Sequence, residues 1–206
     1  VTLRGGPFWD QWSRSQDREV SRLNEYGGKL ALDLKPAPWA LVRADYLLGL
    51  RNGSQYHPYN HLAASLDPGQ LDDPDFASFG QLAQLRKFDE ANRTRNEVKL
   101  LTQLMPREDL DLSFSGGWAL FDYPDSAFGV STSQSWNVGT ELGYQPAPWV
   151  SLSAWYPFEN TRLNQESRWR PVGGTPAAVV DSSENDWSSE ATDLAQYGLA
   201  KPELTV

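Results

Sequence analysis

The residues with the most reactive side chains are scattered along this chain, as the two histidines illustrate. His57 and His61 are its only histidines, and they stand in the segment HPYNH. Two histidines with this spacing can bind zinc when a helix brings them onto one face. Here Pro58 and Asn60 favour a loop instead, and no third ligand lies near them in the sequence. We therefore interpret both histidines as loop residues and predict no metal site.

Neither hydrolysis nor calcium binding is favoured by the sequence. Serines are numerous, but the nucleophile motif G-x-S-x-G is absent, and a serine nucleophile also needs a histidine and an orienting polar group nearby in space. Acidic residues gather within 67–75 and 181–186. Carboxylates can bind calcium, but acidic loops are more commonly just solvated. We predict no catalytic and no cofactor-binding residue, and hence no enzyme.

Composition narrows the class of protein. The net charge of -9, from 27 acidic and 18 basic residues, argues against nucleic-acid binding. The absence of cysteine excludes disulfides, thiolate metal sites and covalent haem attachment within this sequence. No apolar run reaches the length of a transmembrane helix. Barrel strands remain compatible with this composition, because only alternate residues of such strands are apolar.

The elements that would position side chains are predicted to be strands. Between Trp136 and Phe158, apolar and aromatic residues alternate with small or polar ones. This period indicates half-buried strands, and two such runs joined at 145–148 indicate a hairpin. Each run has about nine residues, enough for a tilted strand to cross the hydrocarbon layer of a membrane. The pattern fits a membrane barrel, and it also fits a soluble sandwich with one hydrated face.

The same hairpin design recurs along the chain. The tetrad PAPW stands at Pro36–Trp39 and again at Pro146–Trp149, each time between two alternating runs. A further hairpin is predicted within 93–120. We expect a loop over residues 1–22 and a last strand over 187–200. Longer connections are expected at 51–89, 122–135 and 159–186.

This arrangement predicts an all-β, antiparallel, up-and-down transmembrane β-barrel. Short turns on one side and long loops on the other are typical of outer-membrane barrels. The expected number of strands is about seven, whereas bacterial barrels close with even numbers from about eight upward. Open strand edges are not viable in lipid. We therefore expect residues 1–206 to form a single barrel domain or part of a larger barrel, or to close with other copies.

The alternation assigns side chains to two faces. Charged residues at 29, 33, 43, 45, 97 and 99 could pair across strands inside a lumen. We expect the following to face the lumen and a partner: Ser113, Ser115, Gly117, Asn137, Gly139, Glu141, Gly143, Ser151 and Ser153. We expect the following to face lipid or form aromatic girdles: Trp39, Trp118, Trp136, Leu142, Tyr144, Trp149 and Tyr156.

Two stretches together resemble a known family. Residues 86–129 carry RKFDEANRTR, a hairpin and then DYPDSAFG. Residues 129–200 add SWNVGTELGY, RPVGGTP, NDW and the closing TDLAQYGL. This order resembles the outer-membrane barrels associated with decahaem cytochromes, the MtrB/PioB family. The resemblance spans most of residues 20–200.

The resemblance implies a location in the bacterial outer membrane and a role as a sheath around a periplasmic multihaem c-type cytochrome. Such a barrel insulates the haems from lipid while electrons cross the membrane, and an outer-surface cytochrome can be a second partner. The barrel has no cofactor of its own, because the partner carries the haem. Small lumenal residues such as Gly139 and Ser115 would let a protein plug approach the wall closely.

The chain departs from the family pattern in two places. It lacks the N-terminal C-x-x-C motif of the family, and its last residues lack the terminal aromatic of bacterial barrels. Its first residues also lack the apolar core of a signal peptide. We therefore expect a mature form, a fragment or a truncated relative. Alternative functions are a general porin or transporter, a soluble carbohydrate-binding β-sandwich, and a hydrolase embedded in a barrel.

Overall fold

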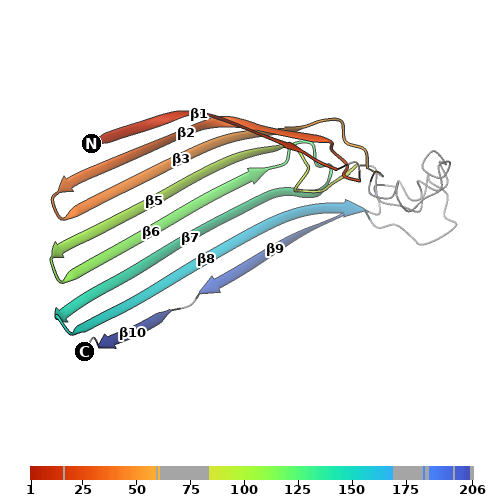
Figure 1. The fold of residues 1–206 in the computed structure, drawn as a ribbon. Helices are drawn as coiled ribbons and strands as arrows, with labels where there is room; N and C mark the ends of the chain where they lie inside the picture. The colour runs from red at the N-terminus through yellow and green to blue at the C-terminus, as the bar shows by residue number, and fades with distance from the viewer. Residues whose placement is uncertain are drawn as a thin grey trace.

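The computed structural model describes residues 1–15, 17–58, 60, 84–168, 183, 186–196 and 198–204. These residues form one antiparallel sheet of long strands, joined at one end by tight turns and at the other by longer connections (Figure 1). The strands are β1 (Thr2–Ser13), β2 (Arg22–Ala37), β3 (Ala40–Gly53), β4 (Leu85–Arg86), β5 (Arg93–Arg107), β6 (Leu110–Asp122), β7 (Phe128–Ala147), β8 (Val150–Arg168), β9 (Asp186–Gln196) and β10 (Leu199–Leu204).

The strand order confirms the predicted up-and-down topology. Neighbours follow the order β1-β2-β3-β5-β6-β7-β8-β10, and β9 pairs with the far half of β8. Only the two-residue strand β4 runs parallel to its partner, β7. Within the described residues the sheet stays open, with β1 at one edge and β9 and β10 at the other. No helix in this part of the chain is long and apolar enough to cross a membrane.

The three tight turns consist of two residues each. They are Pro38–Trp39, Glu108–Asp109 and Pro148–Trp149, and each follows a register shift in the preceding strand. Neighbouring turns are linked, since the Met105 amide donates to the Trp39 carbonyl at 2.7 Å and the Gln145 amide donates to the Asp109 carbonyl at 2.8 Å. The repeated PAPW tetrad therefore marks tight turns at the same end of the strands.

Several predicted boundaries were wrong. Residues 2–13, expected to be a loop, form β1, which pairs with β2 from Thr2↔Asp33 to Ser13↔Arg22. β8 continues to Arg168, ten residues into the loop expected at 159–186, because β9 pairs with this polar extension. The expected last strand is divided into β9 and β10. Most of the loop expected at 51–89 lies outside the described residues.

Buried side chains gather at the loop end of the sheet. The buried apolar residues there are Val20, Leu23, Ala91, Tyr123 and Phe128. We call this end the rim and define it as residues 17–23, 51–53, 86–93 and 123–128. The wall is the remainder of β1, β2, β3 and β5–β8, down to the tight turns. Gly129 adjoins the rim with φ of 105°, and a Cβ there would lie 2.4 Å from the Arg86 carbonyl oxygen, so β4 can pair with β7 only beside a glycine.

Candidate functional site

The wall presents two chemically different faces. Paired residues lie side by side on one face of a sheet, so each row of partners can be read across the strands. One such row is apolar and another, one residue further along the strands, is polar. The apolar row is Leu32–Ala44–Leu100–Gly116–Val138–Phe158, and the polar row is Ala31–Asp45–Lys99–Gly117–Asn137–Glu159.

The apolar face is uncovered by other parts of the described chain. Val138, in its middle, is 48% exposed, whereas a core valine of a soluble domain would be buried. Aromatic residues lie near both ends of this face: Trp118 is paired with Trp136 toward the loops, and Tyr144 lies near the turns. Of the residues predicted to contact lipid, Trp118, Trp136, Leu142, Tyr144 and Tyr156 share this face, while Trp39 and Trp149 lie in the exposed turns.

The nine residues predicted to face a lumen share the polar face of β6–β8, which we call the smooth half. A Cβ on Gly139 would lie 2.7 Å from Ser115 Oγ, so the two strands bring these small side chains into close contact. No lysine, arginine or histidine occurs between Arg107 and Arg162. The acidic residues Asp111 and Glu141 on this face form no ion pair within the described residues.

The polar face of β1, β2, β3 and β5, which we call the charged half, has a different character. Arg43 Nε donates to Asp33 at 2.6 Å, and Arg4 forms an ion pair with the same carboxylate. Asp45 stands directly opposite Lys99 in the register. Cross-strand pairing of charges is thus confirmed for Asp33 and Arg43. The contribution of Arg4 was missed because residues 1–22 were expected to be a loop.

A second ion-pair group lies in the charged half near the rim. Glu25 is only 3% exposed and accepts from Arg93 at 2.7 Å and from Arg95 at 3.4 Å. Arg95 also donates to Glu97 at 2.8 Å. The sequence indicates this group only through the alternation of charged residues at 93, 95, 97 and 99, and their partner Glu25 is far away in the sequence.

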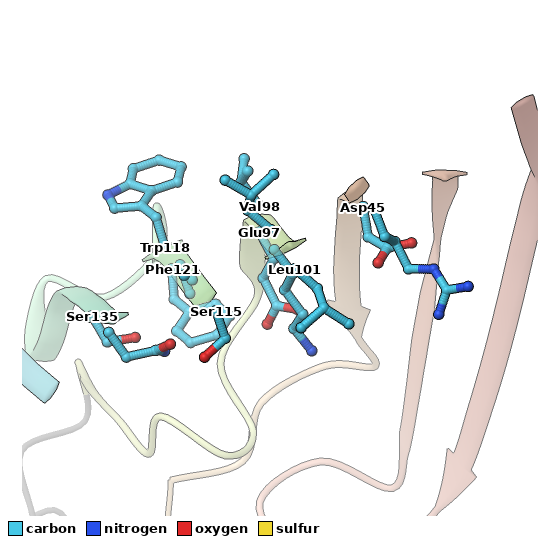
Figure 2. A pocket seen from close by; sticks show the side chains of 15 residues that line it. Asp45, Glu97, Val98, Leu101, Ser115, Trp118, Phe121 and Ser135 are labelled. Atoms are coloured by element: carbon cyan, nitrogen blue, oxygen red, sulfur yellow. The ribbon is translucent and has the colours of Figure 1, made fainter. Parts of the chain in front are cut away.

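A hollow of about 550 Å³ lies where the two halves meet (Figure 2). Asp45 and Glu97 contribute from the charged half, and Ser115 and Ser135 contribute from the smooth half. Figure 2 shows Trp118 and Val98 pointing to one side of the sheet, while Ser115, Ser135 and Phe121 point to the other. The hollow therefore has charged side chains on one flank and serine hydroxyls on the other.

The rim contains a buried pair of carboxyl groups that the sequence did not reveal. Glu19 and Glu90 are 0% and 1% exposed, and their carboxyl groups lie close enough to influence each other's ionisation. Burial raises the pKa of Glu90, and the neighbouring Glu19 raises it further. Burial also opposes ionisation of Glu19, but hydrogen bonds from Lys87 and from its own backbone hold its pKa below the ordinary value. Arg18 forms an ion pair with Glu90, so a positive charge also lies beside the two carboxyl groups.

The candidate metal residues do not come together in the described part of the chain. His57 lies near the rim, where its amide donates to the Glu19 carbonyl at 2.8 Å, and His61 lies outside the described residues. Of the acidic loop segments, only Asp186 is described, and it pairs with Arg168 at 2.5 Å. No group of three or more potential ligands occurs among the described residues.

Comparison with known proteins assigns this two-faced sheet to a family. Residues 1–200 match the family described as outer membrane beta-barrel porin, MtrB/PioB. The chain is also 24% identical over 160 residues to "Outer membrane protein MtrB" of Shewanella baltica (strain OS185), with 77% of this chain and 21% of that protein covered. The chain thus spans about a fifth of the length of this relative. The location predicted from the sequence, the bacterial outer membrane, agrees with both descriptions. The chain belongs to the MtrB/PioB family of outer-membrane β-barrel porins.

Proposed function

We propose that this sheet is part of a non-enzymatic sheath around a periplasmic multihaem c-type cytochrome. In this proposal the apolar face contacts lipid, and the polar face encloses the cytochrome. The barrel insulates the haems while electrons cross the outer membrane, and it carries no cofactor of its own. An outer-surface cytochrome is a further expected partner.

The smooth half is the observation that carries this proposal. Its residues include Gly117, Gly139 and Gly143, and the cross-strand partners of these glycines include Ser115 and Ser153. Short side chains let a folded partner approach the backbone of the wall closely, and they lose little side-chain entropy when they are covered. A water-filled lumen has no comparable need for a flat wall.

The charged half favours a second candidate, a general porin. Ion pairs such as Asp33–Arg43 are stable beside water, and a polar wall is what a water-filled channel has. This candidate predicts ion conductance without any cytochrome. The two candidates therefore differ in what occupies the space beside the polar face.

The test is to purify the full-length barrel from its native host through a tag and measure haem absorbance in detergent. A stoichiometric Soret band that co-elutes with the barrel supports the sheath. A colourless barrel that conducts ions in a planar bilayer contradicts the sheath and supports the porin.

Two glycine substitutions sharpen this test. A Cβ on Gly143, in the smooth half, would have its nearest neighbour at 3.7 Å, and a Cβ on Gly6, in the charged half, would meet nothing within 4 Å. Both sites therefore accept a side chain without disturbing the sheet. We expect Gly143→Trp to lower the haem-to-barrel ratio about tenfold, because overpacking a close contact costs about 1–3 kcal/mol. Gly6→Trp should lower it less. An unchanged haem-to-barrel ratio for Gly143→Trp would mean that the smooth half no longer supports the sheath proposal.

A further inference from the structure

A small cavity with an unusual number of arginines lies where the charged half meets the rim. Its volume is about 200 Å³. Four guanidinium groups line it, from Arg14, Arg51, Arg93 and Arg95, but only two carboxylates do, from Asp10 and Glu25. The lining residues come from β1, β2, β3 and β5 and from Arg14, which directly follows β1.

The carboxylates of the cavity do not neutralise all four arginines. Glu25 is shared by Arg93 and Arg95, and Arg95 also pairs with Glu97. Arg51 is 7% exposed and donates to the carbonyls of Ala91 and Phe88, at 2.6–2.9 Å, but no carboxylate of the described residues forms an ion pair with it. The described hydrogen bond of Arg14 likewise goes to a carbonyl, that of Asp89, at 3.5 Å.

Burial and a neighbouring positive charge both act on Arg51. This residue lies just beyond the row Trp9–Tyr26–Leu50, at the rim and outside the apolar band of the wall. Burial, together with the nearby positive charge of Arg93, lowers the pKa of Arg51 to about 10. An anion in the cavity would relieve this repulsion.

Two of the arginines that line the cavity carry a buried N–H donor without an acceptor among the described residues. They are Arg14 and Arg93, through their Nε atoms. A buried donor without an acceptor is costly, so such groups normally meet a protein atom, a water molecule or a ligand. Oxyanions accept several hydrogen bonds at once, and the planar guanidinium group suits carboxylate and phosphate oxygens.

We propose that this cavity binds a small oxyanion of the phosphate or carboxylate class. Each water molecule occupies roughly 30 Å³ in the liquid, so the cavity has room for a tetrahedral oxyanion together with part of its hydration shell. The anion would tie β1 to β5 through Arg14 and Arg93. This site is independent of the proposed sheath, because its residues lie on this chain alone.

The test uses the purified full-length barrel in detergent, free of cytochrome, with inorganic phosphate as the probe. Phosphate binding is followed by broadening of its 31P resonance. We expect saturable binding that Arg14→Gln weakens about tenfold, because one charge-assisted hydrogen bond is worth roughly that factor. The matched control is Arg107→Gln, since Arg107 pairs with Asp109 at a tight turn and lies outside the cavity. Arg107→Gln should bind phosphate as the unmodified barrel does.

A second variant protects the test against a folding failure. Arg93→Lys keeps a positive charge near Glu25 but removes the planar fork, so it should also weaken binding. Folding of each variant is checked by its heat-dependent mobility on a gel. Absence of saturable broadening in the unmodified barrel would overturn the proposal, and so would unchanged binding in both Arg14→Gln and Arg93→Lys.

The source of the anion is found in a last step. Acetate that displaces phosphate shows that the site also accepts carboxylates. If added cytochrome then displaces phosphate, the natural ligand is a carboxylate on that partner. If phosphate stays bound in the complex, the ligand is a free anion. Both results support an oxyanion site.

Discussion

The wall and the rim are stabilised in different ways although the same strands build both. Side chains on the apolar face of the wall stay exposed, as Leu100 at 48% and Leu142 at 38% illustrate. The rim contains the buried cluster, including Val20 and Leu23, each 1% exposed. The rim therefore resembles the core of a soluble domain, whereas the wall depends on strand pairing and on what covers its two faces. We expect solvent conditions to change the stability of the rim, and lipid to change the stability of the wall.

The largest expected effect is loss of rim packing. A Cβ on Gly53 would lie 2.8 Å from Val20 Cγ1 and 3.3 Å from Leu23 Cδ2, so these residues are closely packed. Leu23→Ala should reduce the free energy of local opening at the rim by about 2–5 kcal/mol, because it leaves a cavity. Hydrogen exchange of the rim amides measures this change. The matched control Leu142→Ala should leave the rim unchanged, and equal rim exchange in the two variants would contradict the separation of rim from wall.

A charge on the apolar face tests the wall. Leu142→Arg should hinder membrane insertion, at a cost of roughly 2–4 kcal/mol near the middle of the bilayer. Glu141→Ala changes the adjacent residue on the opposite face and should insert normally. The fraction of heat-modifiable barrel in the membrane is the measurement. Equal insertion of the two variants would reverse our assignment of the faces to lipid and lumen.

The wall could be predicted from the sequence better than the rim because wall structure is encoded locally. Alternation within β6–β8 gives the strands, their hairpins and the residues that share each face. β1 was missed because TLRGGPFW has no clear alternation, and its pairing with β2 decides its structure. Pro7 is compatible with that strand because β1 lies at an edge of the described sheet. On an edge strand, an N–H that points away from the sheet needs no partner, so a proline can stand there.

The rim and the charged half depend on contacts that no local pattern encodes. Glu19 and Glu90 are 71 residues apart in the sequence, and only the folded strands bring them together. The same holds for Glu25 and Arg93, which are 68 residues apart. Sequence patterns could place these charges on strands or loops, but they could not pair them. The polar extension of β8 was missed for a related reason, since it lies beyond the apolar band and lacks the alternation that lipid imposes.

The smallest expected effect, confined to the rim, is a dependence on pH. The folded rim holds the Glu90 proton more tightly than an unfolded segment would, because burial and Glu19 raise the pKa of Glu90. This contribution to stability is complete below the ordinary glutamate pKa and is lost as pH rises through the raised pKa. Glu19, whose pKa is lowered, contributes in the opposite sense and loses its contribution as pH falls through the lowered value. The rim should therefore be best protected near the ordinary pKa of about 4.3 and less protected at neutral pH.

Glu90→Gln isolates this effect because the amide keeps the shape of the protonated acid without titrating. Protection factors of the rim amides, corrected for the intrinsic exchange rate, should fall with rising pH in the unmodified protein and change little in this variant. Arg18 forms ion pairs with both Asp89 and Glu90, and its pair with Asp89 remains in the variant. The control Glu108→Gln alters an exposed glutamate at a tight turn and should keep the normal pH dependence. If Glu90→Gln also kept the normal pH dependence of rim protection, the buried carboxyl pair could not be the cause of that dependence. The rim would then differ from the wall in packing alone.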